Sequence, residues 1–194
     1  MAIRKDKIVV VDFEMTCWEG FDAPPGQENE IIEMGICLLD PKADVISVSD
    51  KRSIMVKPIR SVISEFCTNL TGITQEMVSE RGIDFPLACH ILETEYDTRN
   101  RLWVSWGNFD HEFLRKQCKA RNVRYPFSKK HSNLKRVFHD TVGERMGLQR
   151  AMNAVGMVRE GNMHRGDDDA YNTALLLKYL IETYGLSILR KYGF

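Results

Sequence analysis

The stretch IVVVDFE, residues 8–14, runs from four β-branched residues into two acids. Such a run predicts a buried β-strand over Ile8 to Phe13. The segment EIIEMGICLLD, Glu30 to Asp40, predicts a second strand, and Asp44 to Lys57 predicts a third. We expect these three successive strands to pair antiparallel and to form the sheet on which the rest of the chain is built.

Helical and strand patterns alternate after Pro58. A short apolar strand, Leu102 to Trp106, is closed by Gly107 and leads into a helix. The expected helices are Val62–Leu70, Gln75–Glu80, Phe85–Asp97, Phe109–Arg121, Leu134–Val142, Leu148–Val155 and Ala170–Tyr184. This order predicts an α/β fold, a mixed sheet with helices on both faces. No linker or repeat interrupts residues 1–194, so a single domain is expected.

Composition excludes several classes of protein. The chain is 43% hydrophobic and balances 27 Lys+Arg against 27 Asp+Glu, which predicts a neutral globule and not a disordered chain. No apolar run approaches the roughly 18 residues of a membrane span, and no membrane partner is expected. Five scattered cysteines without a C-x-x-C pair favour a reducing cytoplasm over a disulfide framework. Because the net charge is zero, a nucleic-acid partner would need a local site.

Three groups of acids are candidates for a metal site. Asp12 and Glu14 stand at i and i+2, on one face of the first strand. Asp110 follows a strand that ends in glycine, and His164 precedes three aspartates that end at Asp169. Each group has a structural alternative, since acids mark strand ends and stabilise a helix start by about 0.3–1 kcal/mol. Capping explains one aspartate of the triple run better than three, because adjacent carboxylates repel one another unless a cation lies between them.

Taken in order, these acids and the histidine resemble the DEDDh superfamily of 3′-to-5′ exonucleases. The runs DFEMTCW, residues 12–18, and FCTNLTGITQ, residues 66–75, resemble its Eri-type members, which include histone-mRNA exonucleases and sporulation-inhibitor-type proteins. The resemblance implies a ribonuclease H-like fold and a two-metal mechanism with Mg²⁺, or with Mn²⁺ as a substitute. The metal ligands that it implies are Asp12, Glu14, Asp110 and Asp169, and the catalytic residues are His164 and Glu14.

The implied reaction removes nucleoside monophosphates from single-stranded or overhanging 3′ ends of RNA, with DNA as a further candidate substrate. His164 suits the general base, because an ordinary histidine pKa of about 6.5 allows proton transfer at neutral pH. The candidate contacts of the terminal nucleotide are Met15, Thr16, Phe66 and Phe109. Stacking on a base and ordinary core packing are equal alternatives for the two phenylalanines.

Two other functions stay open on the sequence alone. The nuclease fold could serve as a regulatory module that binds RNA or a protein without cutting it, although the complete set of acids favours cleavage. Cys17 could act as a nucleophile with a histidine base, but no motif around it supports this chemistry. No motif indicates a protein partner.

Overall fold

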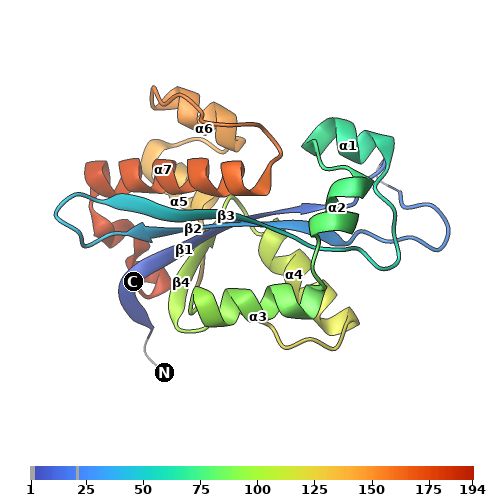
Figure 1. The fold of residues 1–194 in the computed structure, drawn as a ribbon. Coiled ribbons are helices and arrows are strands. Elements are labelled where there is room, and N and C mark those ends of the chain that lie inside the picture. Colours follow the sequence, from blue (N-terminus) through green and yellow to red (C-terminus); the bar gives the residue numbers. More distant parts are fainter. Residues whose placement is uncertain (1–2, 21) are drawn as a thin grey trace.

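The centre of the molecule is a five-stranded sheet in the order β3-β2-β1-β4-β5 (Figure 1), in a computed structural model that describes residues 3–20 and 22–194. β1 (Arg4–Met15), β2 (Ile31–Asp40) and β3 (Ser47–Met55) pair antiparallel, as the sequence predicts. β4 (Arg101–Ser105) and β5 (His131–Asn133) extend the sheet from the other side of β1 and run parallel to it. The sheet is therefore mixed, and its three parallel strands point toward the same end.

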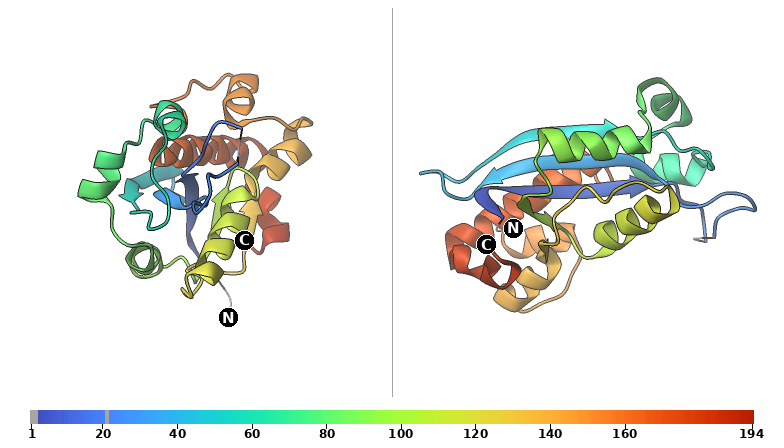
Figure 2. Two further views of the ribbon diagram at one scale, coloured as in Figure 1. Left: turned by 90° about the vertical axis from the view of Figure 1, so that its right-hand side faces the viewer. Right: turned by 90° about the horizontal axis from the view of Figure 1, so that it is seen from below.

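Helices cover both faces of this sheet, which confirms the predicted α/β class. They are α1 (Glu65–Thr71), α2 (Gln75–Arg81), α3 (Phe85–Glu95), α4 (Phe109–Ala120), α5 (Leu134–Val142), α6 (Leu148–Ala154) and α7 (Gly166–Tyr184), followed by a 3₁₀ helix at Leu186–Tyr192. In Figure 1, α6 and α7 lie above the sheet and α3 and α4 below it, and the view from below in Figure 2 brings α3 and α4 to the front. Among the described residues, none of the helices has the length and apolar character of a membrane span.

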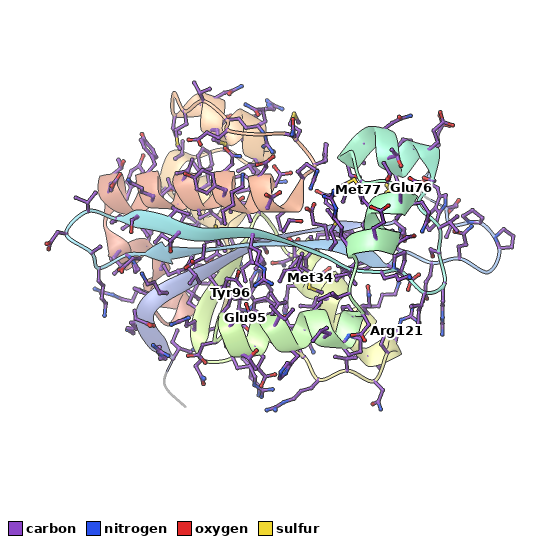
Figure 3. All side chains as sticks on the ribbon, in the orientation of Figure 1. Met34, Glu76, Met77, Glu95, Tyr96 and Arg121 are labelled. Atoms are coloured by element: carbon purple, nitrogen blue, oxygen red, sulfur yellow. The ribbon has the colours of Figure 1, made fainter. Side chains whose placement is uncertain are left out.

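The alternation of side chains along β1 explains the two layers. Val9 and Val11 pack against α3 and α4, whereas Ile8 and Val10 pack beneath α5, α6 and α7. All four side chains are fully buried, and each contributes about 1.5–3 kcal/mol by its burial. Met34 of β2 joins the lower layer, between the sheet and α3 (Figure 3). Since alternate residues point to opposite faces, the acids that follow Val10 are directed to the α7 side.

The first residue of α7 approaches β2 very closely. A Cβ atom added at Gly35 would lie 1.9 Å from the carbonyl carbon of Gly166, so only glycine leaves room for the helix there. Glu33 reinforces the contact, because its Oε2 accepts a hydrogen bond from the Gly166 N–H at 2.8 Å. The start of α7, and the loop that precedes it, are thereby fixed on β2.

We expect Gly35→Ala to lower the free energy of unfolding by about 3 kcal/mol or more, because the new methyl group has to displace the backbone of α7. For a chain of this size, the corresponding fall in Tm is at least roughly 6 °C. Gly147→Ala is the matched control, since a Cβ atom at that position meets nothing within 4 Å. Thermal unfolding followed by circular dichroism makes the comparison. Equal Tm values for the two variants would contradict the close approach.

The boundaries of three helices differ from the expected ones by two residues or more. α7 begins at Gly166 and not at Ala170, so the three aspartates lie inside its first turn. α1 begins at Glu65 and not at Val62, because the side chain of Ser64 caps it by accepting a hydrogen bond from the Cys67 N–H. α3 ends two residues before the expected Asp97, whose φ of 51° lies in the left-handed region.

Candidate active site

One cleft of about 430 Å³ contains all five residues predicted to carry the chemistry. Two of them come from the end of β1, one from the first turn of α4, one from α7 and one from the loop before α7. They are Asp12, Glu14, Asp110, Asp169 and His164. We call this cleft the acidic pocket. Distant parts of the chain therefore converge where the parallel strands end.

β4 stops before the end of β1, and this leaves space for the acids. The pairing between the two strands extends only to Val10 and Val104. Beyond it, the first turn of α4 lies against β1, where Asp110 Oδ1 accepts a hydrogen bond from the Phe13 N–H at 2.9 Å. This bond fixes the carboxylate of Asp110 beside the two carboxylates of β1.

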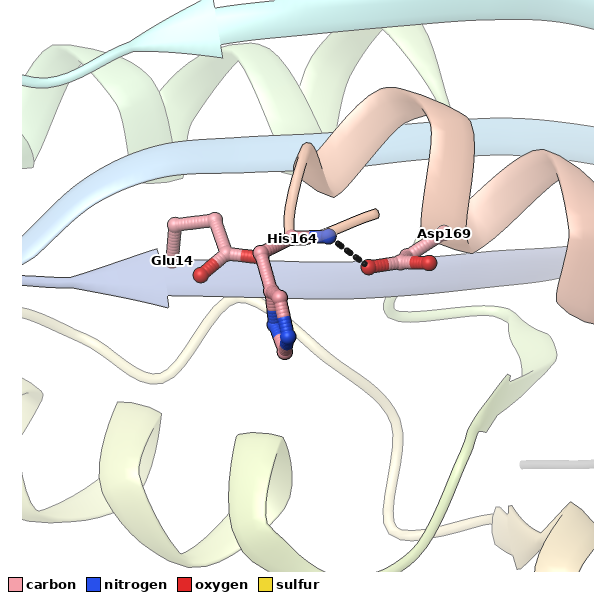
Figure 4. A group of neighbouring side chains, drawn as sticks. All are labelled: Glu14, His164 and Asp169. Atoms are coloured by element: carbon pink, nitrogen blue, oxygen red, sulfur yellow. Dashed lines mark hydrogen bonds between the residues drawn. The ribbon is translucent and has the colours of Figure 1, made fainter. Parts of the chain in front are cut away.

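Glu14, His164 and Asp169 form a compact group, in which one ligand atom from each lies within 4.8 Å of the others. In Figure 4, Glu14 extends from β1 while His164 and Asp169 come from the start of α7 and the loop before it. The His164 N–H donates to Asp169 Oδ2 at 2.9 Å, which couples the loop to the helix. His164 has a φ of 56°, a left-handed conformation that Asn, Asp and His adopt more readily than most residues.

Glu33 is a residue of this site that no sequence motif indicates. Its side chain is fully buried in β2. Oε1 accepts a hydrogen bond from Arg165 Nη2 at 3.1 Å and Oε2 accepts one from the Gly166 N–H, so Glu33 holds the two residues that follow His164. The available signal was an acid in the middle of the apolar strand EIIEMGICLLD, since a buried charge requires a partner.

Arg159 is a second residue without a sequence signal. It lines the acidic pocket and forms an ion pair with Asp169, and its Nη2 also donates to the Asn162 carbonyl at 2.7 Å. Both side chains are largely buried, at 10% and 13% exposure. Asp169 is therefore bound on one oxygen by Arg159 and on the other by the backbone of His164.

The two aspartates before Asp169 have structural partners. Asp168 forms an ion pair with Lys51 and accepts a hydrogen bond from the Asn162 N–H at 2.7 Å. Asp167 lies 3.9 Å from Lys51 Nζ. None of the three aspartates caps the helix, because the N-cap residue is Arg165. All three lie in the first turn of α7, where acids interact favourably with the helix dipole. Asp169 is the member of the triple run that enters the acidic pocket.

Crowding of the carboxylates raises their pKa values. Burial, followed by repulsion from Asp110 and Glu14, raises the pKa of Asp12 well above its ordinary range. Burial and the charges of Asp169 and Glu33 raise the pKa of Glu14 to about 8, and burial raises the pKa of Asp110 to about 6. A cation would relieve this repulsion, and a set of carboxylate oxygens suits a hard divalent ion. The residues present therefore fit a divalent metal.

We expect the metal-free protein to become less stable between about pH 6.5 and pH 8.5. A group with a raised folded-state pKa stabilises the fold fully below its unfolded value, near 4.3 for Glu, and loses this contribution as the pH rises through its folded value, about 8 for Glu14. Burial lowers the pKa of His131 to about 3. This group makes the fold more stable as the pH rises, but only below its unfolded-state pKa near 6.5, outside the range of this test.

The measurement is Tm in EDTA at the two pH values, repeated with Mg²⁺. A loss of ~1 kcal/mol lowers Tm by about 2–4 °C in a chain of this size. Mg²⁺ should reduce the loss, because it neutralises the carboxylates once they ionise. A Tm in EDTA that stays constant or rises over this range would contradict the expected repulsion.

Two of the four candidate nucleotide contacts lie in the acidic pocket, namely Met15 and Phe109. Phe109 is 63% exposed and its ring lies 5.8 Å from that of Phe113. Phe66 is outside the pocket lining, on α1, and is 38% exposed. It is adjacent to Cys67, whose thiol contacts the Met15 carbonyl at 3.5 Å, so α1 lies against the backbone of a residue that lines the pocket.

Thr16 and Cys17, which directly follow β1, are both unsuited to the roles considered for them. Thr16 is fully buried, and its hydroxyl donates to the Glu28 carbonyl at 3.0 Å and accepts from the Glu30 N–H at 2.9 Å. Its side chain therefore holds the turn into β2 and is not available to a nucleotide. Burial, together with Cys67, raises the pKa of the Cys17 thiol to about 12, so this thiol stays protonated at neutral pH and is a poor nucleophile.

Residues 9–177 match a family of exonucleases, RNase_T. The chain belongs to the RNase_T exonuclease family. This RNase_T chain is 31% identical to the 3′-5′ exoribonuclease 1 of Homo sapiens, in an alignment that covers 91% of the chain and 53% of that relative. It is 29% identical to the probable 3′-5′ exonuclease KapD of Bacillus subtilis, over 89% of the chain and 83% of KapD. The chain spans about half the length of the human relative.

The RNase_T chain also resembles a solved nuclease structure along almost its whole length. The nuclease domain of 3′hExo, a DEDDh family member bound to rAMP, superposes with a TM-score of 0.82 at 29% identity, covering 92% of each chain. The resemblance to DEDDh exonucleases and the predicted ribonuclease H-like fold are both confirmed. The five residues that carried the resemblance are the five that meet in the acidic pocket.

Proposed function

We propose that residues 1–194 act as a single metal-dependent 3′-to-5′ exonuclease domain. It removes nucleoside monophosphates from single-stranded or overhanging 3′ ends of RNA, and DNA is the competing substrate. The observation that carries this proposal is the convergence of four carboxylates and His164 in one pocket. Family membership supports the reaction class, and the relatives named as exoribonucleases support RNA.

Asp12, Glu14, Asp110 and Asp169 would hold two divalent ions, Mg²⁺ or Mn²⁺. Such ions supply Lewis-acid stabilisation of the phosphate and a bound water of lowered pKa. Arg159 has to share or release Asp169 when metal binds, because its guanidinium occupies one of the two oxygens of that carboxylate. A released guanidinium could then donate to phosphate oxygens.

His164 would act as the general base. Its side chain is exposed in the acidic pocket and lies in one group with Glu14 and Asp169, so it can reach a water bound at these carboxylates. The carboxylates must stay ionised to hold metal, which leaves the imidazole to accept the proton. Glu33 keeps the imidazole in position through Arg165 and Gly166.

The test is a time course on matched RNA and DNA oligonucleotides labelled at the 5′ end, with Mg²⁺ or Mn²⁺. We expect a labelled ladder that shortens one nucleotide at a time, unlabelled mononucleotides detected by chromatography, faster loss of RNA than of DNA, and no action on a circular RNA, which lacks a 3′ end. If all the linear substrates stay intact with either metal, the proposal fails and the non-cleaving regulatory module takes its place.

Phe109 is the stronger stacking candidate, because it combines exposure with a place in the pocket lining. We expect Phe109→Ala to raise KM for a short RNA about 5- to 150-fold, which corresponds to the ~1–3 kcal/mol of one stacked base, with a smaller effect on kcat. Leu87→Ala, at an exposed apolar position on α3, is the control. An unchanged KM would show that Phe109 does not stack on the terminal base and serves only in packing. Phe66 and Met15 stay candidate contacts, and a cytoplasmic location stays a prediction.

A further inference from the structure

The chain contains a long segment without any acid. From Phe113 to His139 there are nine Lys or Arg residues and no Asp or Glu. These nine are one third of the 27 basic residues, in a chain whose opposite charges cancel. Although the net charge of the chain is zero, its charges are therefore distributed very unevenly along the sequence.

Two of the nine basic residues are used in ion pairs. Arg121, at the end of α4 in Figure 3, pairs with the buried Glu30, and Arg124 lies 3.6 Å from Glu93. The other seven form no ion pair with any carboxylate of the described residues. Five of these lie on α4 and on the first turn of α5, and we call them the basic surface: Arg115, Lys116, Lys119, Lys135 and Arg136. Four are exposed and Lys135 is half-buried.

Both helices of the basic surface begin next to the acidic pocket. α4 starts with Phe109 and Asp110, which line the pocket. α5 directly follows β5, which is parallel to β4 and ends on the same side. Asn133 Nδ2 donates to Asn108 Oδ1 at 3.0 Å, and this bond joins the two helix starts. The basic surface therefore starts beside the pocket on both faces of the sheet, along α4 on one face and along α5 on the other.

Along α4, aromatic and basic side chains follow one another away from the pocket. Phe109 and Phe113 stack, and Lys116 and Lys119 continue at three-residue spacing, which places them near the same helix face. At ~1.5 Å per residue, the helix covers about 15 Å from Phe109 to Lys119. That length matches about four phosphates at the ~3.4 Å spacing of a stacked strand.

We propose that the basic surface binds the phosphates of the RNA strand directly upstream of the 3′-terminal nucleotide. This inference rests on the proposed function, since it is the acidic pocket that would hold the last nucleotide. Cations without protein partners can neutralise phosphates and release counterions, which makes binding dependent on salt. The row of two aromatic rings followed by lysines suits a strand of stacked bases on a charged backbone better than it suits an acidic protein. The affinity should therefore grow with the length of the RNA.

The test compares two double variants, Lys116→Gln/Lys119→Gln and Lys135→Gln/Arg136→Gln. Gln has nearly the helix propensity of Lys and Arg, so both variants should fold normally. The matched control is Lys5→Gln/Lys42→Gln, which removes two exposed lysines near the start of β1, at the opposite end of this strand from the acids. All are placed in an Asp12→Asn background, so that the RNA stays intact while it is bound.

Binding of a fluorescent polyuridine of about 12 nucleotides is measured by anisotropy at several KCl concentrations. Each double variant should bind about tenfold more weakly at low salt, and the slope of log K against log salt should fall by about 1.4, or ~0.7 for each lost phosphate contact. The control should match its parent, and a dinucleotide should bind all the proteins alike.

If both double variants match their parent in affinity and slope, the proposal is overturned. Because the readout is binding, this outcome counts against the basic surface whether or not the wild-type protein cleaves. Cleavage of the linear oligonucleotides by wild type, scored separately with Mg²⁺ or Mn²⁺, decides the proposed function. The two inferences can therefore fail independently.

Discussion

Asp12→Asn should lower the rate of cleavage of a single-stranded 3′ end by at least about 10³-fold. The substitution keeps the size of the side chain but removes one of the charges that hold the metal ions. Metal ions contribute several kcal/mol of charge stabilisation in the transition state, and ~4 kcal/mol corresponds to about 10³ in rate. Single-turnover cleavage of an end-labelled RNA with Mg²⁺ measures the effect.

The same substitution should raise the Tm of the protein in EDTA. The pKa of Asp12 is raised by burial and by the neighbouring carboxylates, so its ionisation destabilises the metal-free fold at neutral pH. Asp6 on the same strand is the matched control. A side-chain hydrogen bond to Arg101 lowers its pKa, so Asp6→Asn should lower Tm and leave cleavage unchanged.

If Asp12→Asn cleaves within tenfold of the wild-type rate, Asp12 is not an essential metal ligand. A fall in its Tm in EDTA as large as that of Asp6→Asn would show that Asp12 is not repelled by its neighbours. Activity and stability are thus expected to change in opposite directions at Asp12, as is common where a site is built for function and not for stability.

His164→Asn should lower kcat by about 10²–10⁴-fold, the usual contribution of a general base. Asn is preferred to Ala because the backbone at this position is left-handed, with a φ of 56°, and Asn tolerates that conformation. The fold and the hydrogen bond from the backbone N–H to Asp169 should therefore survive. His90→Asn, at an exposed position on α3, is the control and should keep the wild-type rate.

The compact grouping of His164 with Glu14 and Asp169 leaves two roles to separate, because a histidine at this distance could bind metal instead of taking a proton. A general base can be removed without loss of Mg²⁺ affinity, which calorimetry measures. Its loss should also abolish the rise of kcat with pH on the acidic side of the profile. A drop in Mg²⁺ affinity that matches the drop in kcat would make His164 a metal ligand.

The helices and strands that could be predicted from the sequence are those with a clear local pattern of apolar residues. Nearly continuous apolar runs locate β1 and β2, and helical spacing gives Leu134–Val142 the bounds that α5 has. β5 gives no such signal, since His131–Asn133 is polar and becomes a strand only because its backbone pairs with Trp103–Ser105. The 3₁₀ helix at Leu186–Tyr192 likewise lies outside the expected elements.

At the site, the candidate metal ligands and the candidate base were predictable from the sequence. The residues that pair with them and hold them in position were not. Spacing along the chain singles out the acids, but it cannot show that Asp168 is paired with Lys51, which lies 117 residues away. The burial of Thr16 depends on backbone atoms across the turn into β2. Glu33 and Arg159 likewise act through contacts that only folding brings about.

The two ends of the described chain lie close together. Lys5 Nζ, near the amino end of β1, lies 5.8 Å from the centre of the Phe194 ring, and the N and C labels lie on the same side of the molecule in Figure 1. Asp12 and Glu14 lie near the carboxyl end of β1. A bead, a coated slide or a fluorescent protein could therefore be attached near either end of the described chain with the acidic pocket turned outward. Single molecules anchored in this way would test the proposed function directly, since each would be expected to shorten an individual RNA strand.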